Sequence, residues 1–232
     1  MADVVVQAGH CHRRAGATGT HREQEFTWAL GRRLRDLLAE HGHVVTLIGA
    51  DDPVPTSDAF VALHTDGSSN PRRRGASVGY PDAAGARLAA AWKRAHQRHG
   101  YPGGFLRDNY TPALRGYYGF RKSRAPVRFL AEHGTTTNRA DELWLFSHLE
   151  QCAQAHLDAV NSLFPPPIDP EDDDMKLSDE DVERIGRRVA DFVAAGAPAE
   201  NGTAHLRRLL VRVLEELAAL PAKVAAAVKA QP

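Results

Sequence analysis

The chain has 232 residues, and its 29 Lys and Arg balance its 29 Asp and Glu, so its formal net charge is zero. This length predicts one or two domains with a sizeable core. Its two cysteines exclude a disulfide framework, although a single bridge between Cys11 and Cys152 stays open. No apolar run approaches the roughly 18 residues of a membrane span, which excludes membrane insertion.

The charge is unevenly distributed along the chain. Residues up to Phe164 include 20 Lys and Arg and 16 Asp and Glu, which gives a net charge of +4. The residues after Phe164 include 9 Lys and Arg and 13 Asp and Glu, which gives a net charge of −4. The first part also holds 11 of the 12 histidines. A mildly basic domain suits an anionic wall polymer, whereas +4 is too small to indicate a nucleic acid partner.

The first predicted strand is the β-branched run 4–7, which ends shortly before His10. A loop with Gly16 and Gly19 follows, and Glu23 then stands where a helical pattern begins. That pattern carries apolar side chains at three- and four-residue steps: Phe26, Leu30, Leu34, Leu37 and Leu38. Two rigid elements are therefore expected to hold an imidazole and a carboxylate.

Residues 44–48 form the second predicted strand, so strand, helix and strand indicate a βαβ unit. The apolar run 60–63 then ends in His64, followed by the turn-forming Asp66 and Gly67. The basic turn 70–75 is either a solvated turn or a contact to an anionic wall.

A short strand at 77–80 and a helix from about 82 to 99 come next. Residues 101–123 form a long connection rich in Gly, Pro and Tyr. Such loops are usually functional or disordered, and this one is interpreted as a groove wall for a polymer or as packing over a sheet edge.

Another apolar run, 127–131, ends in Glu132 and is followed by a helix for which Asn138 is the expected N-cap. Three predicted strands thus end in an ionisable residue. A catalytic zinc requires three nitrogen or oxygen ligands and leaves its fourth position to water, and His10, Glu23 and His64 can supply that set.

These motifs together resemble the zinc-dependent N-acetylmuramoyl-L-alanine amidases. The shared pattern covers roughly residues 4–164 and has four parts in order. A strand is followed by Gly-His, a Glu opens the next helix, a second strand ends in the sequence LHTDG, and a third ends in LAEHG and is followed by Asn138. The resemblance implies an α/β fold, with a twisted, mostly parallel or mixed sheet flanked by helices on both faces. It implies Zn²⁺ on His10, Glu23 and His64, and the helix phase selects Glu23 over Glu25.

The resemblance also implies a reaction: hydrolysis of the peptidoglycan amide between N-acetylmuramic acid and L-alanine, with Glu132 as general base. Residues expected to contact the substrate are Asp66, Arg121 and His133; His133 would hydrogen-bond the developing oxyanion.

The chain departs from the family pattern at Gln7, where Asp is common, and at Ala62, where Ser is often found. Cys11, His12 and His21 are further potential ligands. Two alternatives therefore stay open: a catalytically silent wall-binding or scaffold protein on this fold, and a zinc amidohydrolase of a soluble small amide.

Residues 165–177 combine prolines with a run of acids and are interpreted as a linker between a catalytic domain, 1–164, and a helical segment, 178–232. The two helices predicted there have apolar steps of three and four, typical of a coiled coil. They are expected to mediate self-association, to dock on the amidase domain or to attach to the wall.

The N-terminus enters its first strand without a basic segment, an apolar segment or a cleavage site, so no secretion signal is predicted. The expectation is synthesis in the cytoplasm and action on the cell wall after release, as for phage lysins.

Overall fold

The computed structural model describes residues 1–10 and 16–165. Cys11 and His12, the predicted linker and the predicted C-terminal helices lie outside these described residues. Within the described part, no helix is both long enough and apolar enough to cross a bilayer.

The described residues are built on a five-stranded sheet with strand order β2-β1-β3-β5-β4. Its strands are β1 (Asp3–Ala8), β2 (Val44–Gly49), β3 (Ala59–Asp66), β4 (Ser77–Gly79) and β5 (Val127–Thr135). β1, β2, β3 and β5 run parallel, and β4 pairs antiparallel with β5 at the edge. The mostly parallel, mixed sheet predicted from the sequence is confirmed.

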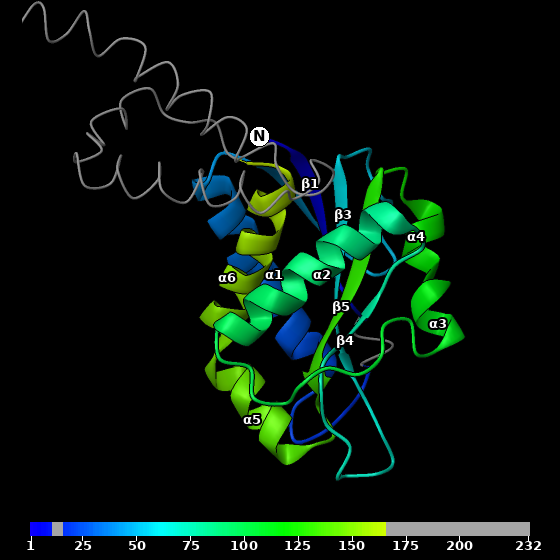
Figure 1. The fold of residues 1–232 in the computed structure, drawn as a ribbon, viewed down its shortest axis with the longest axis vertical. Coiled ribbons are helices and arrows are strands. Elements are labelled where there is room, and N and C mark those ends of the chain that lie inside the picture. The colour runs from blue at the N-terminus through cyan, green and yellow to red at the C-terminus, as the bar shows by residue number, and fades with distance from the viewer. Residues whose placement is uncertain (11–15, 166–232) are drawn as a thin grey trace, which may run out of the picture. The chain divides into compact units, whose positions relative to one another are not determined.

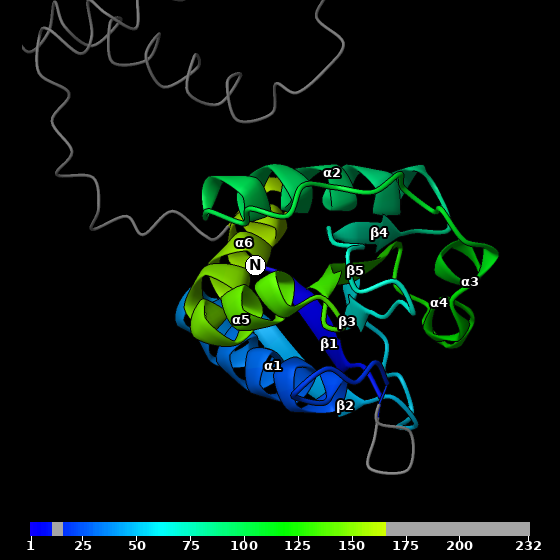
Figure 2. The same ribbon diagram turned by 90° about the horizontal axis from the view of Figure 1, so that it is seen from below.

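Helices cover both faces of the sheet (Figure 1 and Figure 2). One face carries the long helices α1 (Glu23–Glu40), α2 (Ala83–Arg98) and α6 (Leu149–Leu163), with α5 (Arg139–Ser147) beside them. The short helices α3 (Pro112–Arg115) and α4 (Tyr118–Lys122) lie on the other side of the sheet.

Strand alternation divides the core into two clusters, one on each face. Val4 and Val6 point toward the long helices, whereas Val5, between them, joins Leu114 and Phe120 of the short helices. Successive side chains of a strand face opposite sides of a sheet, so a central strand buried on both faces is apolar along its whole length.

Two segments differ from their prediction. Residues 101–123 contain α3 and α4, and the helix expected after Asn138 breaks at His148 into α5 and α6. Asn138 caps α5 as predicted by accepting hydrogen bonds from two backbone amides. Cys152 is a free, buried thiol in α6.

A cluster of buried histidines lies under the long helices. His156 Nε2 lies 2.8 Å from His133 Nε2, and His96 Nε2 lies 3.0 Å from the His133 carbonyl oxygen. Trp92 stacks on His96. Burial, followed by the charge of His133, lowers the pKa of His96 to about 3, and burial also holds the pKa of His156 well below its ordinary value.

These buried histidines are expected to make the fold acid-sensitive. The unfolded chain takes up protons below about pH 6.5 while buried His96 stays neutral, so stability is lost as pH falls below that value. We expect His96 alone to lower the free energy of unfolding by about 2 kcal/mol between pH 7 and pH 5. Urea unfolding of His96→Gln at both pH values should show a smaller loss. The same change at exposed His41 is the control, and an unchanged pH dependence in His96→Gln would contradict the expectation.

Candidate metal centre

The parallel pairing of β1, β3 and β5 gathers the ionisable residues at one end of the sheet. Ala8 pairs with Leu63, so His10, two residues after β1, lies near the level of His64, which is within β3. His64 pairs directly with Glu132 of β5. The carboxyl ends of parallel strands share one edge of a sheet, which is where binding sites of such sheets form.

His10 occupies a strained backbone position at this edge. Its φ is 62°, in the left-handed region that a residue with a side chain rarely adopts. Gly9, just before it, passes so close to the neighbouring strand that a Cβ there would lie 2.5 Å from the Leu63 carbonyl oxygen and 2.7 Å from His64 Nδ1. This close passage turns His10 back toward His64, and strain of this kind is typical of functional sites.

Glu23 is the first residue of α1 and is only 1% exposed. Its Oε1 accepts a hydrogen bond from the Thr65 amide at 2.9 Å and its Oε2 accepts one from the Ala17 amide at 2.8 Å. Glu25, two residues later, is exposed and takes part in the capping box with Arg22. The start of the helix therefore turns Glu23 inward and Glu25 outward.

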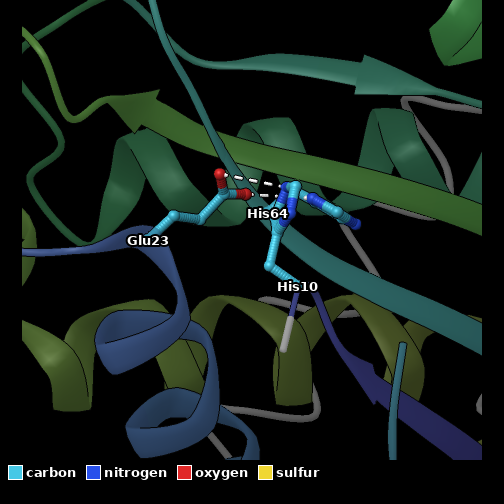
Figure 3. A group of neighbouring side chains, drawn as sticks. All are labelled: His10, Glu23 and His64. Atoms are coloured by element: carbon cyan, nitrogen blue, oxygen red, sulfur yellow. Dashed lines mark hydrogen bonds and ion pairs between the residues drawn. The ribbon is translucent and has the colours of Figure 1, made fainter. Parts of the chain in front are cut away.

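Figure 3 shows His10, Glu23 and His64 converging on one point. His64 Nδ1 lies 3.0 Å from Glu23 Oε1, and His10 Nε2 lies 3.2 Å from Glu23 Oε2. One ligand atom from each residue can be chosen so that all three lie within 4.8 Å of one another. Ligands of a tetrahedral zinc with bonds of about 2.1 Å are about 3.4 Å apart, and the two distances between imidazole nitrogen and Glu23 oxygen are close to that value.

The surroundings of this cluster also fit a bound cation. Gly16 has a φ of 78°, and a Cβ on it would lie 2.2 Å from Glu23 Oε2 and 2.6 Å from His10 Cδ2. The backbone thus leaves room beside the ligand atoms that a larger residue would fill. Two imidazoles and one carboxylate are also the donor set of many catalytic zinc sites.

Glu23 is a buried anion stabilised by its neighbours. Burial by itself raises the pKa of Glu23, but the hydrogen bond and charge of His64, the charge of His10 and the Thr65 amide lower it on balance. The carboxylate is therefore ionised at neutral pH, as a metal ligand must be.

Glu132 faces the same space from β5. Among the described residues its Oε2 is buried and has no hydrogen-bond partner. Burial, followed by the negative charges of Glu23 and Asp66, raises the pKa of Glu132 well above its ordinary value. An unsatisfied carboxyl group with a raised pKa, beside a potential metal site, has the properties of a general base or acid.

A cavity of about 510 Å³ opens over these residues. Its wall includes His10, His64 and Glu132 from the ends of the parallel strands, and Tyr110 and Tyr117 from the segment before α4. Tyr118 and Lys122 of α4 lie at the same cavity. The predicted role of residues 101–123 as a groove wall is therefore supported for its second half, while Tyr101 is buried in the core.

Asp66 lines this cavity, as expected for a substrate contact. Its carboxylate accepts a hydrogen bond from Tyr110 and lies 3.5 Å from Arg73 Nη2, and the Arg73 guanidinium lies 4.8 Å from the centre of the Tyr110 ring. The basic turn before β4 is thereby tied to the cavity wall through Arg73.

His133 does not reach the cavity, which corrects the expectation that it hydrogen-bonds the oxyanion. Neighbouring residues of β5 face opposite sides, so Glu132 points to the cavity and His133 into the core under the long helices. Its side chain is fully buried, and its ring nitrogens meet the His64 carbonyl oxygen and His156.

Arg121 does not line the cavity either. It is exposed on α4, and its guanidinium donates a hydrogen bond to the Gly116 carbonyl oxygen at 3.4 Å. The neighbouring Lys122 lines the cavity instead. The sequence alone could not distinguish Arg121 from Lys122, because the short helix α4 was not predicted. On a helix, the side chains of adjacent residues point in different directions.

His21 lies apart from the ligand cluster. Its ring stacks on Phe146, and its Nδ1 lies 3.4 Å from Glu142 Oε1. Glu142 also accepts a hydrogen bond from the His21 amide and pairs with Arg139. The structure thus gives His21 a role in fastening the loop before α1 to α5 rather than in replacing Glu23.

Asp141, next to Glu142, fastens a second loop. This fully buried carboxylate accepts hydrogen bonds from the Arg74 side chain and from the Gly75 amide at 2.9 and 2.8 Å. It also accepts from the Tyr101 hydroxyl at 2.9 Å and from the Thr135 amide at 3.1 Å. The first turn of α5 therefore binds the loop before α1 through Glu142 and the loop before β4 through Asp141.

Sequence reasoning missed the contact of Tyr117 with the ligand His64 and the contact of Gln7 with Tyr117. The Tyr117 oxygen lies 3.0 Å from His64 Nε2, and its hydroxyl donates to Gln7 Oε1 at 2.7 Å. Burial and a hydrogen bond with Tyr118 raise the pKa of Tyr117 above its ordinary value, so the hydroxyl keeps its proton. The signals available in the sequence were the tyrosine-rich composition of residues 101–123 and the departure from the family pattern at Gln7.

Replacing Gly16 tests whether the space beside the ligand atoms matters. We expect Gly16→Ala to lower the affinity for divalent metal at least tenfold, because the new methyl group would overlap Glu23 and His10. Metal titration with a competing chromophoric chelator measures this.

Gly104→Ala is the matched control, since Gly104 also has a positive φ, 71°, but nothing lies within 4 Å of its Cβ position. Both variants should lose about 1 kcal/mol of stability from the left-handed backbone. Equal metal affinities of the two variants would contradict the expectation.

Comparison with known proteins places the chain in a family. The N-acetylmuramoyl-L-alanine amidase family Amidase_3 matches residues 4–162. Among curated protein sequences, none matches significantly.

Solved structures show the same fold. The N-acetylmuramoyl-L-alanine amidase AmiC2 of Nostoc punctiforme is 25% identical, with a TM-score of 0.58 over 70% of this chain and 96% of that one. The catalytic domain of CwlV from Bacillus (Paenibacillus) polymyxa var. colistinus is 22% identical, with a TM-score of 0.58 over 71% and 98%. The catalytic domain of the CD27L endolysin, which targets Clostridia difficile, is 18% identical, with a TM-score of 0.52 over 73% and 100%.

Members of the matched family depend on a metal, in agreement with the His, Glu and His cluster found here. Because the family match spans more than half of the sequence, this chain belongs to the N-acetylmuramoyl-L-alanine amidase family and is a peptidoglycan amidase.

Proposed function

We propose that this amidase holds Zn²⁺ on His10, Glu23 and His64 and uses Glu132 as the general base to hydrolyse the amide between N-acetylmuramic acid and L-alanine. The observation that carries the proposal is the convergence of the three ligand atoms within 4.8 Å at the edge where Glu132 pairs with His64. Three protein ligands leave a further position for water, as in catalytic zinc sites.

The chemistry divides between the cation and the carboxyl group. When bound, zinc supplies a Lewis acid that makes water more acidic and polarises the scissile carbonyl. Glu132 takes the proton of the attacking water with its carboxylate and then delivers it to the nitrogen of the leaving L-alanine. The free Oε2, which has no partner among the described side chains, is the atom suited to hold this proton.

The polymer substrate is accommodated by the cavity wall. Asp66 and Tyr110 form one side of the cavity, and their mutual hydrogen bond gives a fixed polar surface against which the glycan or the stem peptide can lie. Lys122 adds a positive charge at this cavity, which suits an anionic stem peptide.

The domain arrangement and delivery are part of the same proposal. The family match ends at residue 162, which supports a catalytic domain of residues 1–164 joined by the 165–177 linker to the 178–232 segment. That segment would link copies of the protein through a coiled coil. Action on the wall after release from the cytoplasm, as by a phage endolysin, would then bring several catalytic domains to the polymer together.

Glu132→Gln tests the general base. The substitution keeps the shape of the side chain but removes its basicity, so we expect kcat to fall by about 10²- to 10⁴-fold while bound metal stays the same. New L-alanine amino termini released from purified peptidoglycan measure the activity, and elemental analysis identifies the metal and its amount.

Glu25→Gln serves as the matched control, because Glu25 lies exposed two residues from Glu23 and should retain both metal and activity. Full metal with undiminished amide cleavage in Glu132→Gln would overturn the role of Glu132. Absence of bound metal from active wild-type enzyme would overturn the metal site itself.

The carboxylate of Asp66 is expected to shift the acid limb of the pH profile of kcat/KM, because it changes the pKa of Glu132. Glu132 must be ionised to act as base, so kcat/KM falls as pH drops through its pKa. Asp66 is one cause of the raised pKa of Glu132. In Asp66→Asn the limb should therefore move to lower pH, whatever happens to KM. A limb that stays in place or moves to higher pH would contradict this expectation, and Asp108→Asn, outside the cavity, is the control.

A further inference from the structure

We propose that Tyr117 and Gln7 are positioning residues that fix the orientation and the tautomer of His64, so that its Nδ1 is the metal-binding atom. The inference rests on the metal site proposed above and goes beyond it, because it assigns a role to two residues that do not themselves contact the metal.

The two nitrogens of His64 have different surroundings. Nδ1 lies 3.0 Å from Glu23 Oε1 and therefore faces the point where the ligand atoms converge. Nε2 lies 3.0 Å from the Tyr117 oxygen. The two rings meet edge to face, with centroids 5.2 Å apart and an interplanar angle of 79°. Tyr117 thus restrains the ring on the side away from the cluster.

Ala50, Gln7, Tyr117 and His64 form a series of hydrogen bonds, and the direction of each bond follows from the Ala50 carbonyl oxygen at one end. The Ala50 carbonyl oxygen can only accept, so the Gln7 amide turns its Nε2 toward that oxygen, at 3.5 Å. Gln7 Oε1 consequently faces Tyr117 and can only accept, so the Tyr117 hydroxyl donates to it at 2.7 Å.

The Tyr117 oxygen is then left to accept a proton from His64 Nε2. A neutral imidazole carries its proton on one nitrogen and a lone pair on the other. The Glu23 carboxylate also can only accept, so Nδ1 competes for the proton as long as no cation is bound. When a cation occupies the cluster, it takes the lone pair of Nδ1 and the proton stays at Nε2, bonded to Tyr117. The backbone oxygen of Ala50 thereby selects the tautomer of metal-bound His64 through two intervening side chains.

The chain of contacts is held by rigid parts of the fold. Gln7 is fully buried in β1, between β2 and β3, and Tyr117 stands directly before α4. Tyr118, the next residue, donates to the same Ala50 oxygen at 2.7 Å, which fixes the start of α4. Side chains that hold a metal-binding histidine through its second nitrogen typically account for 10- to 100-fold in metal affinity.

The test compares zinc affinity by chelator competition in the full-length protein. Wild type should bind zinc, and Tyr117→Phe, which keeps the ring but loses the hydroxyl, should bind about 10- to 100-fold more weakly. Tyr80→Phe is the matched control: the Tyr80 hydroxyl also donates to a side-chain oxygen, that of Asp108, but Tyr80 lies outside the cavity, so zinc affinity should be unchanged.

Gln7→Met provides a second, independent break in the chain of contacts. It should also weaken zinc binding, and the double variant should bind no more weakly than Tyr117→Phe alone, because the contact with His64 is already lost. Thermal unfolding of the metal-free variants separates this effect from a general loss of stability, which would lower the melting temperature without a matching loss of zinc affinity.

A measurement on the unaltered protein covers the case in which a variant fails to fold. Nitrogen-15 NMR of the zinc-loaded wild type should show His64 protonated at Nε2 and bound through Nδ1. Binding through Nε2, zinc affinity of folded Tyr117→Phe within twofold of wild type, or additive losses in the double variant would each overturn the inference. Wild-type protein that binds no zinc would overturn the metal site as well, which distinguishes the two failures.

Discussion

The buried carboxylate of Glu23 is the interaction on which the rest of the site depends. An anion that is almost completely removed from water is tolerated only when neighbouring groups compensate its charge. Two backbone amides, from Ala17 and Thr65, and the two imidazoles do so from three different parts of the chain. The strand order brings these parts together, so the sheet and the charge balance at its edge depend on each other.

Much of this arrangement could be predicted from the sequence, because short apolar runs that end in a charged residue place that residue at the edge of a parallel sheet. The choice of Glu23 over Glu25 followed from the position of the ligand at the start of the helix in the resembling family, and in the structure Glu23 is buried and Glu25 exposed. His133 was misjudged, although the period of two along β5 already separated it from Glu132. Phe129, Ala131 and His133 share the face that the long helices cover.

Other parts could not be predicted, because they depend on contacts between distant segments. Tyr117 lies 110 positions along the chain from Gln7, and nothing local indicates that the two side chains meet. Gln7 was noted only as a departure from the family pattern, a sign of weaker support for the ligands. In the structure it accepts the hydrogen bond from Tyr117, so a neutral amide occupies a place where a carboxylate is common. The short helices that carry Tyr117 to this place were expected as a loop.

The two adjacent carboxylates at the start of α5 have a consequence for how the enzyme meets its polymer. Glu142 fastens the segment before α1, and Asp141 fastens the arginine-containing turn before β4, each through buried or partly buried hydrogen bonds. The described residues next to α1 and β4, His21 and Gly75 among them, are thus held in place by folding itself, so binding of a long glycan strand does not have to bear the entropy cost of immobilising them.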